Sequence, residues 1–437
     1  MKAKEIALGL CKFGLPLSSG GGFLRNVITV ASGTVIGQGI VVLASPIITR
    51  LYDPADLGIL AVYGSILSIF TVIASLRYEI VIPLPEEEAD AVNILGLALS
   101  IVFITSLLVG GICLILGRQI ADLVKAPGLR PHLWILPIGV GLIGAYQVFA
   151  SWAVRKQSFG LIAKTKVNQG IGSVLTQVGL GILKIKPLGL LIGQVIGLAS
   201  GSSTIGLQLL KQNRTLLKNL SFERMRRIAL RYKRFPFVGA PAALLNSFTV
   251  NLPAILFAAF YGPQVAGWYA ITQRAIGMPL NLAGQSIAQV YFGKAAPLVR
   301  SSSDSFSRLS RSLFLRLLFI GLLIMAPIVL IAPSLFVFVF GSKWAESGSY
   351  LPRLAPLFVA QFISLPFGCT LDILEQQGLF LLREIVRIAL IILAFLTMEI
   401  FGLSARGGMT VLGIAGGTGY LVYILIAFYA IKKSKNA

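Results

Sequence analysis

The chain has 437 residues, of which 56% are hydrophobic and 12% are charged. Soluble domains carry about 25% charged residues, so this composition excludes an ordinary water-soluble fold and favours an integral membrane protein. A net charge of +22 would suggest nucleic-acid binding in a soluble protein, but here the basic residues lie between apolar runs, which indicates basic cytoplasmic loops and no nucleic-acid partner.

In chain order, residues 1–24 end in a flexible Ser/Gly stretch and are expected to form a short cytoplasmic tail. A membrane-spanning helix needs about 20 mostly apolar residues. The apolar segments that follow therefore predict about twelve transmembrane helices. They cover residues 26–49, 57–82, 91–116, 132–154, 164–183 and 188–210 in the first half, and 237–260, 265–292, 312–340, 350–371, 380–402 and 408–431 in the second.

The stretch 211–236 contains nine Lys and Arg residues and divides the expected spans into two sets. We interpret it as a basic cytoplasmic linker between an amino-terminal lobe (25–210) and a carboxy-terminal lobe (237–431), followed by a cytoplasmic tail (432–437). Its charge is typical of anchoring against anionic lipid head groups, with recognition of a soluble partner as the alternative. Most other Lys and Arg fall in alternate connections, which predicts that both termini are cytoplasmic.

The two halves resemble one another in sequence. Tyr52-Asp53-Pro54 through Gly58 and Tyr261-Gly262-Pro263 through Gly267 share the pattern Y-x-P-x-x-x-G. A second echo pairs 117–122 with 341–346. Both echoes fall at equivalent places in the expected topology, so they predict two parallel six-helix repeats with a substrate site between them.

The sequence contains no motif that indicates a cofactor or metal site in the context where it lies. The G-x-G-x-x-G pattern at 139–144 lies inside an expected span with no strand before it, so helix packing explains it better. The sequence has no phosphate-binding G-x-x-x-x-G-K-[ST] loop, one histidine (His132) and three scattered cysteines. We therefore expect a transporter without a bound cofactor or metal, and not an enzyme.

Polar residues within the spans are the main functional signal. Arg274 is expected deep in the eighth span, where a charge costs about 2.5–3.5 kcal/mol on insertion scales, and such residues usually face a polar cavity. A structural ion pair is the alternative. Arg25, Arg77 beside Glu79, and the group Arg383, Glu384 and Arg387 could extend a cationic path, although each lies near an expected interface, where snorkelling also explains it.

Spans seven and eight are also rich in amides, a composition that suits a hydrated cavity for sugars as well as interhelical hydrogen bonding. These residues are Asn246, Asn251, Gln273, Asn281, Gln285 and Gln289. Prolines are expected to interrupt or kink several helices. They are Pro46, Pro241, Pro253, Pro279, Pro327 and Pro366.

Several stretches together resemble a known family. They are Arg25-Asn26 with Gly33-Thr34, Thr49-Arg50-Leu51-Tyr52 through Gly58, Arg77-Tyr78-Glu79 through Pro85, Phe235-Pro236, Pro241 through Asn246, Gly267-Trp268-Tyr269 through Arg274, and Trp344-Ala345-Glu346-Ser347-Gly348. The chain resembles the bacterial polysaccharide and O-antigen flippases of the multidrug, oligosaccharidyl-lipid and polysaccharide exporter superfamily, over about residues 25–430.

The resemblance implies two six-helix lobes around a central cavity that opens alternately to each side of the bacterial inner membrane. The cargo would be an oligosaccharide on an undecaprenyl diphosphate carrier, used in polysaccharide or O-antigen biosynthesis together with a polymerase and other assembly proteins. Arg274, Arg25 and Arg77 would meet the diphosphate, since arginine binds phosphate well. Asn246, Asn251, Gln273 and Gln285 would meet the sugars.

The resemblance also implies coupling to an H⁺ or Na⁺ gradient, for which Glu79, Asp372 and Glu399 are the candidate residues. A monomer within membrane lipids is sufficient for the two-lobed plan. Two alternatives stay open: an ion-coupled multidrug exporter of the same superfamily, and a membrane-embedded polysaccharide polymerase or ligase.

Overall fold

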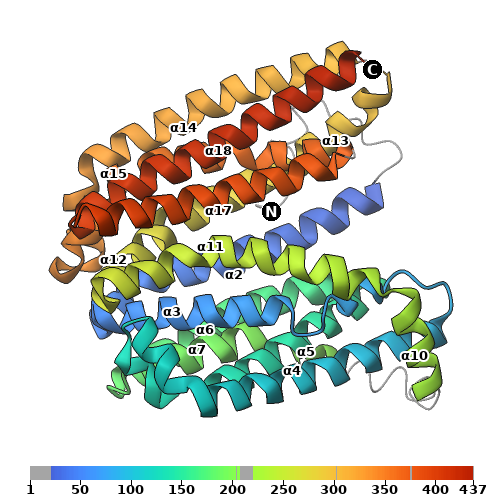
Figure 1. Ribbon diagram of the computed structural model, residues 1–437, viewed down its shortest axis with the longest axis horizontal. Coiled ribbons are helices and arrows are strands. Elements are labelled where there is room, and N and C mark those ends of the chain that lie inside the picture. The colour runs from blue at the N-terminus through green and yellow to red at the C-terminus, as the bar shows by residue number, and fades with distance from the viewer. Residues whose placement is uncertain (1–20, 203, 207–219, 302, 375, 437) are drawn as a thin grey trace, which may run out of the picture.

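The computed structural model describes residues 21–436 apart from 203, 207–219, 302 and 375, and in this part of the chain all regular structure is helical. The helices form two groups that meet at one end of the molecule and diverge toward the other (Figure 1). The amino-terminal lobe contains α2 (Gly21–Leu51), α3 (Pro54–Val72), η1 (Tyr78–Val81), α4 (Glu88–Leu123), η2 (Pro127–His132), α5 (Ile135–Arg155), α6 (Phe159–Ile182) and α7 (Leu188–Ala199).

The carboxy-terminal lobe follows a short amphipathic helix, α10 (Phe222–Arg231), which lies at the diverging end (Figure 1). This lobe contains η3 (Phe235–Gly239), α11 (Ala240–Tyr261), α12 (Pro263–Thr272), η4 (Gln273–Gly277), α13 (Met278–Ser301), α14 (Ser303–Phe340), η5 (Ser342–Trp344), α15 (Ala345–Ser364), η6 (Leu365–Phe367), α16 (Gly368–Ile373), α17 (Gln377–Ile400) and α18 (Ala405–Asn436). The expected two-lobed, all-helical membrane architecture is confirmed.

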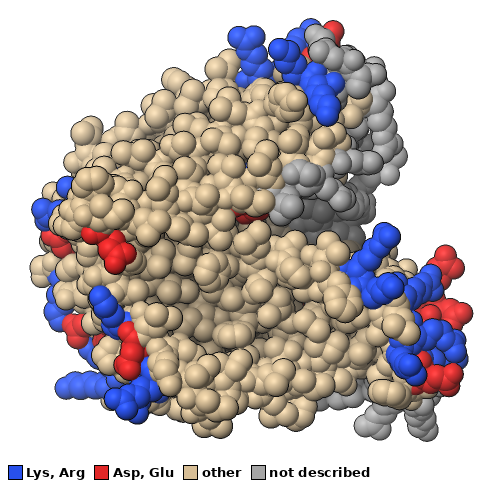
Figure 2. Space-filling model, in the orientation of Figure 1, with Lys and Arg blue, Asp and Glu red and all other residues tan. Residues whose placement is uncertain are grey.

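Charged residues gather at the two ends of the molecule, and the surface between them is almost free of charge on the face shown in Figure 2. This distribution is what a protein in a bilayer requires, because charged side chains are costly in hydrocarbon. Each of the expected spans overlaps a helix. Eight helices of the described residues are long and apolar enough to cross a membrane, so the number of twelve stays a prediction.

The two longest helices of the described residues far exceed the thickness of a bilayer core. α4 has 36 residues and α14 has 38. At the rise of an α-helix each is about 55 Å long, against a hydrocarbon core of about 30 Å. Each is the third expected span of its own half, and both expose a large apolar surface. The shared excess length adds to the similarity of the two halves.

The second expected span, residues 57–82, is wrong in its last third. α3 ends at Val72, and the chain turns through Leu76 and Arg77, both with positive φ, before the short η1 helix. Val81 and Ile82 are fully buried in this connection. Apolar residues that pack as a buried loop have the same hydropathy as a helix, so composition could not separate the two.

Two prolines follow π turns, in which a backbone N–H bonds to the carbonyl five residues back. The N–H of Ala240 donates to Phe235 and is followed by Pro241, and the N–H of Met278 donates to Gln273 and is followed by Pro279. Proline has no N–H and collides with the carbonyl four residues before it. The wider turn accommodates both defects, and it breaks the expected eighth span into α12, η4 and α13.

Glycines let α2 and α6 approach closely. A Cβ placed on Gly37 would lie 2.2 Å from the carbonyl oxygen of Lys166, and one on Gly170 would lie 2.3 Å from the carbonyl oxygen of Gly37. Backbone atoms therefore occupy the space that any side chain would need. The helix-packing interpretation of the small residues is confirmed here, and Gly139 and Gly144 likewise pack against side chains of neighbouring helices.

We expect Gly37→Val to destabilise the amino-terminal lobe by about 1–3 kcal/mol, because a backbone carbonyl cannot move aside as a side chain can. Gly39→Val is the matched control: it lies on the same helix, and its Cβ would meet nothing within 4 Å. Thermal unfolding of the detergent-solubilised protein measures both. Equal losses in the two variants would show that helix propensity, and not the α2–α6 contact, sets the effect.

Candidate functional site

A cavity of about 770 Å³ lies between the two lobes. Its wall is formed by α2, α3, α5 and α7 on one side and by α11, α12, η4, α13, α15, α17 and α18 on the other. Amide side chains line both sides. They are Gln38, Gln147 and Gln194 in the amino-terminal lobe, and Asn251, Gln273, Asn281, Gln285 and Gln361 in the carboxy-terminal lobe.

The charged residues that line this cavity, within the described part of the chain, are Arg274 and Arg387. Arg274 comes from the π turn η4, whose extra residue per turn changes the direction of the side chains that follow it. Its Nη1 atom is buried and has no hydrogen-bond partner among the described residues. The alternative expectation was a structural ion pair, and Arg274 forms none within the described part of the chain.

Three of the amides predicted for sugar binding also line the cavity. The Nδ2 of Asn251 donates to the Ser247 carbonyl at 2.8 Å and to Ser68 Oγ, of the other lobe, at 3.3 Å. Gln273 and Gln285 line the wall nearby. Asn246, the fourth, is exposed on α11 and is not part of the wall. Their roles in binding stay predictions.

The other two arginines predicted to meet the diphosphate are Arg77 and Arg25, and neither is among the described residues that line the cavity. Arg77 lies beyond the end of α3, where its Nη1 is 3.6 Å from Glu79 Oε1, and it is absent from the cavity wall. Arg25 falls in the first turns of α2, and its side chain lies outside the described part of the structure.

The candidates for ion coupling are scattered. Glu79 is buried, accepts a hydrogen bond from Ser75 Oγ and pairs with Arg77, away from the cavity. Glu399 is exposed near the end of α17, and the Asp372 side chain lies outside the described part. No group of three or more His, Cys, Asp or Glu residues within the described ranges could hold a metal ion.

Sequence reasoning placed Arg387 near an interface and did not name Tyr420, Gln147, Gln194 or Gln361 at all, although all of them line the cavity. The available signal was the presence of lone amides in otherwise apolar segments. Sequence analysis predicted cavity residues from this signal only in spans seven and eight, where the amides are most frequent.

The two copies of the Y-x-P-x-x-x-G motif, at 52–58 and 261–267, meet at the end of the molecule where the lobes converge (Figure 1). A Cβ on Gly58 would lie 1.7 Å from the Pro263 carbonyl oxygen, and one on Gly267 would lie 1.8 Å from the Pro54 carbonyl oxygen. The contact is reciprocal: each repeat's glycine receives the backbone of the other repeat. We call this α3–α12 contact the seam, and it closes the cavity at that end.

Polar contacts between the lobes surround the seam. Lys343 Nζ lies 2.6 Å from Asp53 Oδ1 of the other lobe. Within the amino-terminal lobe, Lys186 Nζ lies 3.8 Å from the second oxygen of the same carboxylate, Asp53 Oδ2. The indole Nε1 of Trp344, which is fully buried, donates to the Thr49 carbonyl at 3.0 Å. The hydrogen bond from Lys343 lowers the pKa of the Asp53 carboxyl and raises the pKa of the lysine.

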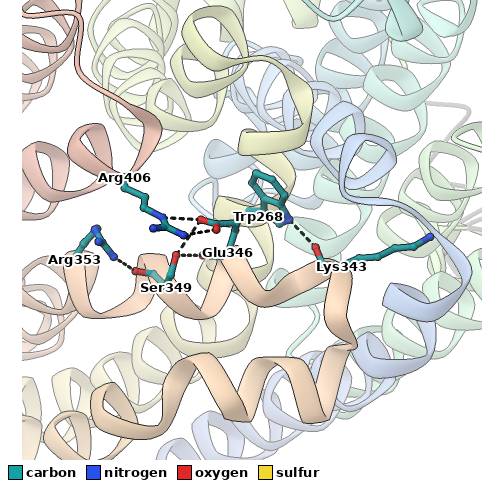
Figure 3. A network of polar contacts seen from close by, with 6 residues as sticks. All are labelled: Trp268, Lys343, Glu346, Ser349, Arg353 and Arg406. Carbon is teal, nitrogen blue, oxygen red and sulfur yellow. Dashed lines mark hydrogen bonds and ion pairs between the residues drawn. The ribbon is translucent and has the colours of Figure 1, made fainter.

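A second set of contacts fixes the carboxy-terminal side of this end (Figure 3). The indole of Trp268 donates to the Lys343 carbonyl at 2.9 Å. Glu346 accepts from Arg406 Nε at 3.0 Å and from Ser349 Oγ at 3.1 Å, and the hydrogen bond from Arg406 lowers the pKa of the Glu346 carboxyl. These contacts hold the η5 turn that presents Lys343 to Asp53.

A model of the family described as polysaccharide biosynthesis protein matches residues 47–349. No curated protein matches the chain at a significant level. Among solved structures, the inward-facing conformation of a multidrug resistance MATE family transporter of the MOP superfamily has a TM-score of 0.75 at 15% identity, with 94% of this chain and 99% of that chain covered.

The lipid II flippase MurJ, in an inward closed conformation, has a TM-score of 0.73 at 13% identity, covering 94% of this chain and 87% of the flippase. The outward-facing conformation of a multidrug resistance MATE family transporter gives 0.57 at 14% identity, covering 94% and 96%. At these identities the likeness shows a shared fold.

We expect the Asp53–Lys343 pair to hold the seam closed. Because the pKa of Asp53 is lowered in the closed form, the stabilisation is complete above the ordinary pKa of an aspartate, near 4, and is lost as the pH falls through the lowered pKa. Asp53→Asn should open the seam more often and remove this acid dependence.

Labelling of a cysteine introduced as Ser65→Cys, at the cavity wall, measures opening, in a background where Cys11, Cys113 and Cys369 are replaced by serine. A membrane-impermeant thiol reagent is added from the seam side at pH values from 7 to below 4. Each rate is divided by that of the control at the same pH, because the reactive thiolate fraction itself falls with pH. Arg118→Gln, an exposed charge on α4, is the control. Equal labelling rates for Asp53→Asn and the control would contradict the expectation.

Proposed function

The chain belongs to the polysaccharide biosynthesis protein family, and on that premise we propose that it is a flippase for undecaprenyl-diphosphate-linked oligosaccharide. It moves this cargo from the cytoplasmic to the outer face of the bacterial inner membrane by alternating access, for polysaccharide or O-antigen biosynthesis. The observation that carries the proposal is Arg274, a buried cation without an anionic partner in the wall of the cavity between the lobes.

A buried charge without a counter-ion is costly, and a bound anion removes most of that cost. Phosphate is well suited, since the guanidinium offers a fork of N–H donors that matches phosphate oxygens. The many amides of the wall are matched to the hydroxyl groups of a sugar. The lipid tail of such a cargo can stay in the bilayer, so the cavity needs to hold only the polar part.

Sidedness comes from the charge distribution. The arginines of α10 lie at the diverging end of the lobes, opposite the seam. The positive-inside rule puts that end in the cytoplasm, so the cavity faces the side on which the cargo is made. The higher TM-score with the inward-facing transporter than with the outward-facing one supports the same assignment.

The alternative of multidrug export, the role printed for the MATE transporters, is disfavoured for cationic drugs by Arg274 and Arg387, which would repel such a cargo. A polymerase or ligase that lengthens the lipid-linked chain is the remaining alternative. Incubation of the purified protein with lipid-linked repeat units separates it, because a flippase leaves the chain length unchanged.

We expect Arg274→Ala to lower flipping of lipid-linked oligosaccharide in proteoliposomes by about 10- to 150-fold, the equivalent of a hydrogen bond to a charged group worth about 1.5–3 kcal/mol. Arg274→Lys should retain part of the activity, because it keeps the charge and loses the fork. Arg118→Ala, at an exposed site on α4, is the control. Normal polysaccharide export with altered drug resistance in Arg274→Ala cells would defeat the proposal.

A further inference from the structure

A buried charged cluster joins α17 to α18 in the carboxy-terminal lobe. At its centre is Glu384, which is 3% exposed. Its Oε1 accepts hydrogen bonds from Arg383, with the Nε donor at 2.9 Å, and the Arg383 guanidinium lies 4.2 Å from the centre of the Tyr423 ring. Arg383 therefore pairs with the carboxylate on the side away from the cavity, since neither Arg383 nor Tyr423 is part of the cavity wall.

Arg387 is held much more weakly. Its Nη1 is 3.8 Å from Glu384 Oε2, and that oxygen is buried without a hydrogen-bond partner among the described residues. The guanidinium lies 4.9 Å from the centre of the Tyr420 ring, and both residues line the cavity. Arg387 forms no hydrogen bond to another residue of the described part, so its N–H donors stay available at the cavity wall.

The charges of this cluster do not cancel. Arg383 compensates Glu384, which leaves Arg387 as a surplus cation, and Arg274 is a second one. The cavity wall thus carries two arginines and, within the described ranges, no carboxylate. A diphosphate that bridges a lipid and a sugar carries two negative charges at neutral pH, whereas a phosphate diester carries one. Two cations match the diphosphate.

We propose that Arg387 is a second anion-binding residue and that Glu384 is its partner in the empty cavity. When a lipid-linked diphosphate enters, Arg387 transfers its N–H donors from the weak contact with Glu384 to the second phosphate, and Glu384 stays neutralised by Arg383. The inference rests on the proposed flippase function and adds to it a discrimination between diphosphate and monophosphate carriers.

Both arginines belong to the carboxy-terminal lobe, in η4 and α17, while the opposite wall offers amides and hydroxyls. The diphosphate would therefore move with the carboxy-terminal lobe when the seam opens. Because the Arg387 guanidinium lies over the Tyr420 ring at the cavity wall, the cation–π contact holds it there before the cargo arrives.

The test measures binding of two glycolipids that carry the same sugar to the purified full-length protein. One is linked to undecaprenol through a diphosphate, with two negative charges, and the other through a single phosphate diester, with one. Arg387→Gln should weaken diphosphate binding about tenfold or more and change monophosphate binding less than threefold. Glu384→Gln removes the competitor for Arg387 without a change in size, so diphosphate binding should tighten at least threefold while kcat for flipping falls, because release slows. Arg353→Gln, an arginine of the same lobe outside the cavity wall, is the matched control.

A purely structural role for the cluster would weaken both lipids equally in Arg387→Gln and would weaken binding in Glu384→Gln; either result overturns the inference. If Arg387→Gln fails to fold, Arg387→Lys keeps the charge and should lose part of the diphosphate preference, and an unchanged preference would overturn the inference too. These outcomes leave the flippase assignment intact, because that assignment is tested separately, by transport in Arg274→Ala and by the chain length of lipid-linked repeat units.

Discussion

The structure depends on keeping a positive charge inside a membrane protein without a built-in anion. Arg274 and Arg387 face a cavity between two lobes of largely apolar helices. Such charges are tolerable only where polar groups or water solvate them. The surrounding amides supply part of that environment, and under the proposed function the anionic cargo supplies the rest. The amides of the cavity wall and the lack of carboxylates among its described residues both fit one electrostatic requirement: the arginines are solvated without being neutralised.

The seam explains how two similar halves can form such a cavity. Gly58 and Gly267 occupy matching positions in their repeats, and each receives the backbone of the other. The close backbone approach joins the lobes at this end, whereas they diverge toward the other end of the molecule. The Asp53–Lys343 ion pair is exposed and adds only a modest stabilisation to the backbone contact, which suits a seam that opens and closes under the proposed alternating access.

Much of this architecture could be predicted from residues alone, and the reasons for the failures are specific. Long apolar segments indicate spans regardless of their neighbours, so the helices were found, and the Y-x-P-x-x-x-G echo correctly marked equivalent places in the two halves. Residues 73–82 were misassigned because a buried loop and a buried helix have equal hydropathy. Arg77 and Arg387 looked alike in sequence, each near the end of a span beside a glutamate. Arg77 forms an ion pair with Glu79. Glu384 instead accepts hydrogen bonds from Arg383, which leaves Arg387 only weakly paired, and three-dimensional contacts alone distinguish the two cases.

The π turn at Gln273–Gly277 connects the backbone to the electrostatics. Pro279 removes a donor that a regular helix needs, and the wider turn that accommodates it lies where Arg274 enters the cavity. The equivalent π turn before Pro241, at Phe235–Gly239, leads into α11, the helix that carries Asn251. Each proline therefore acts at a distance of several residues, by setting the direction of the polar side chains on its helix. A helix that kept ideal geometry through residues 273–279 would present a different side chain to the cavity, and the charge would face lipid or the protein interior instead.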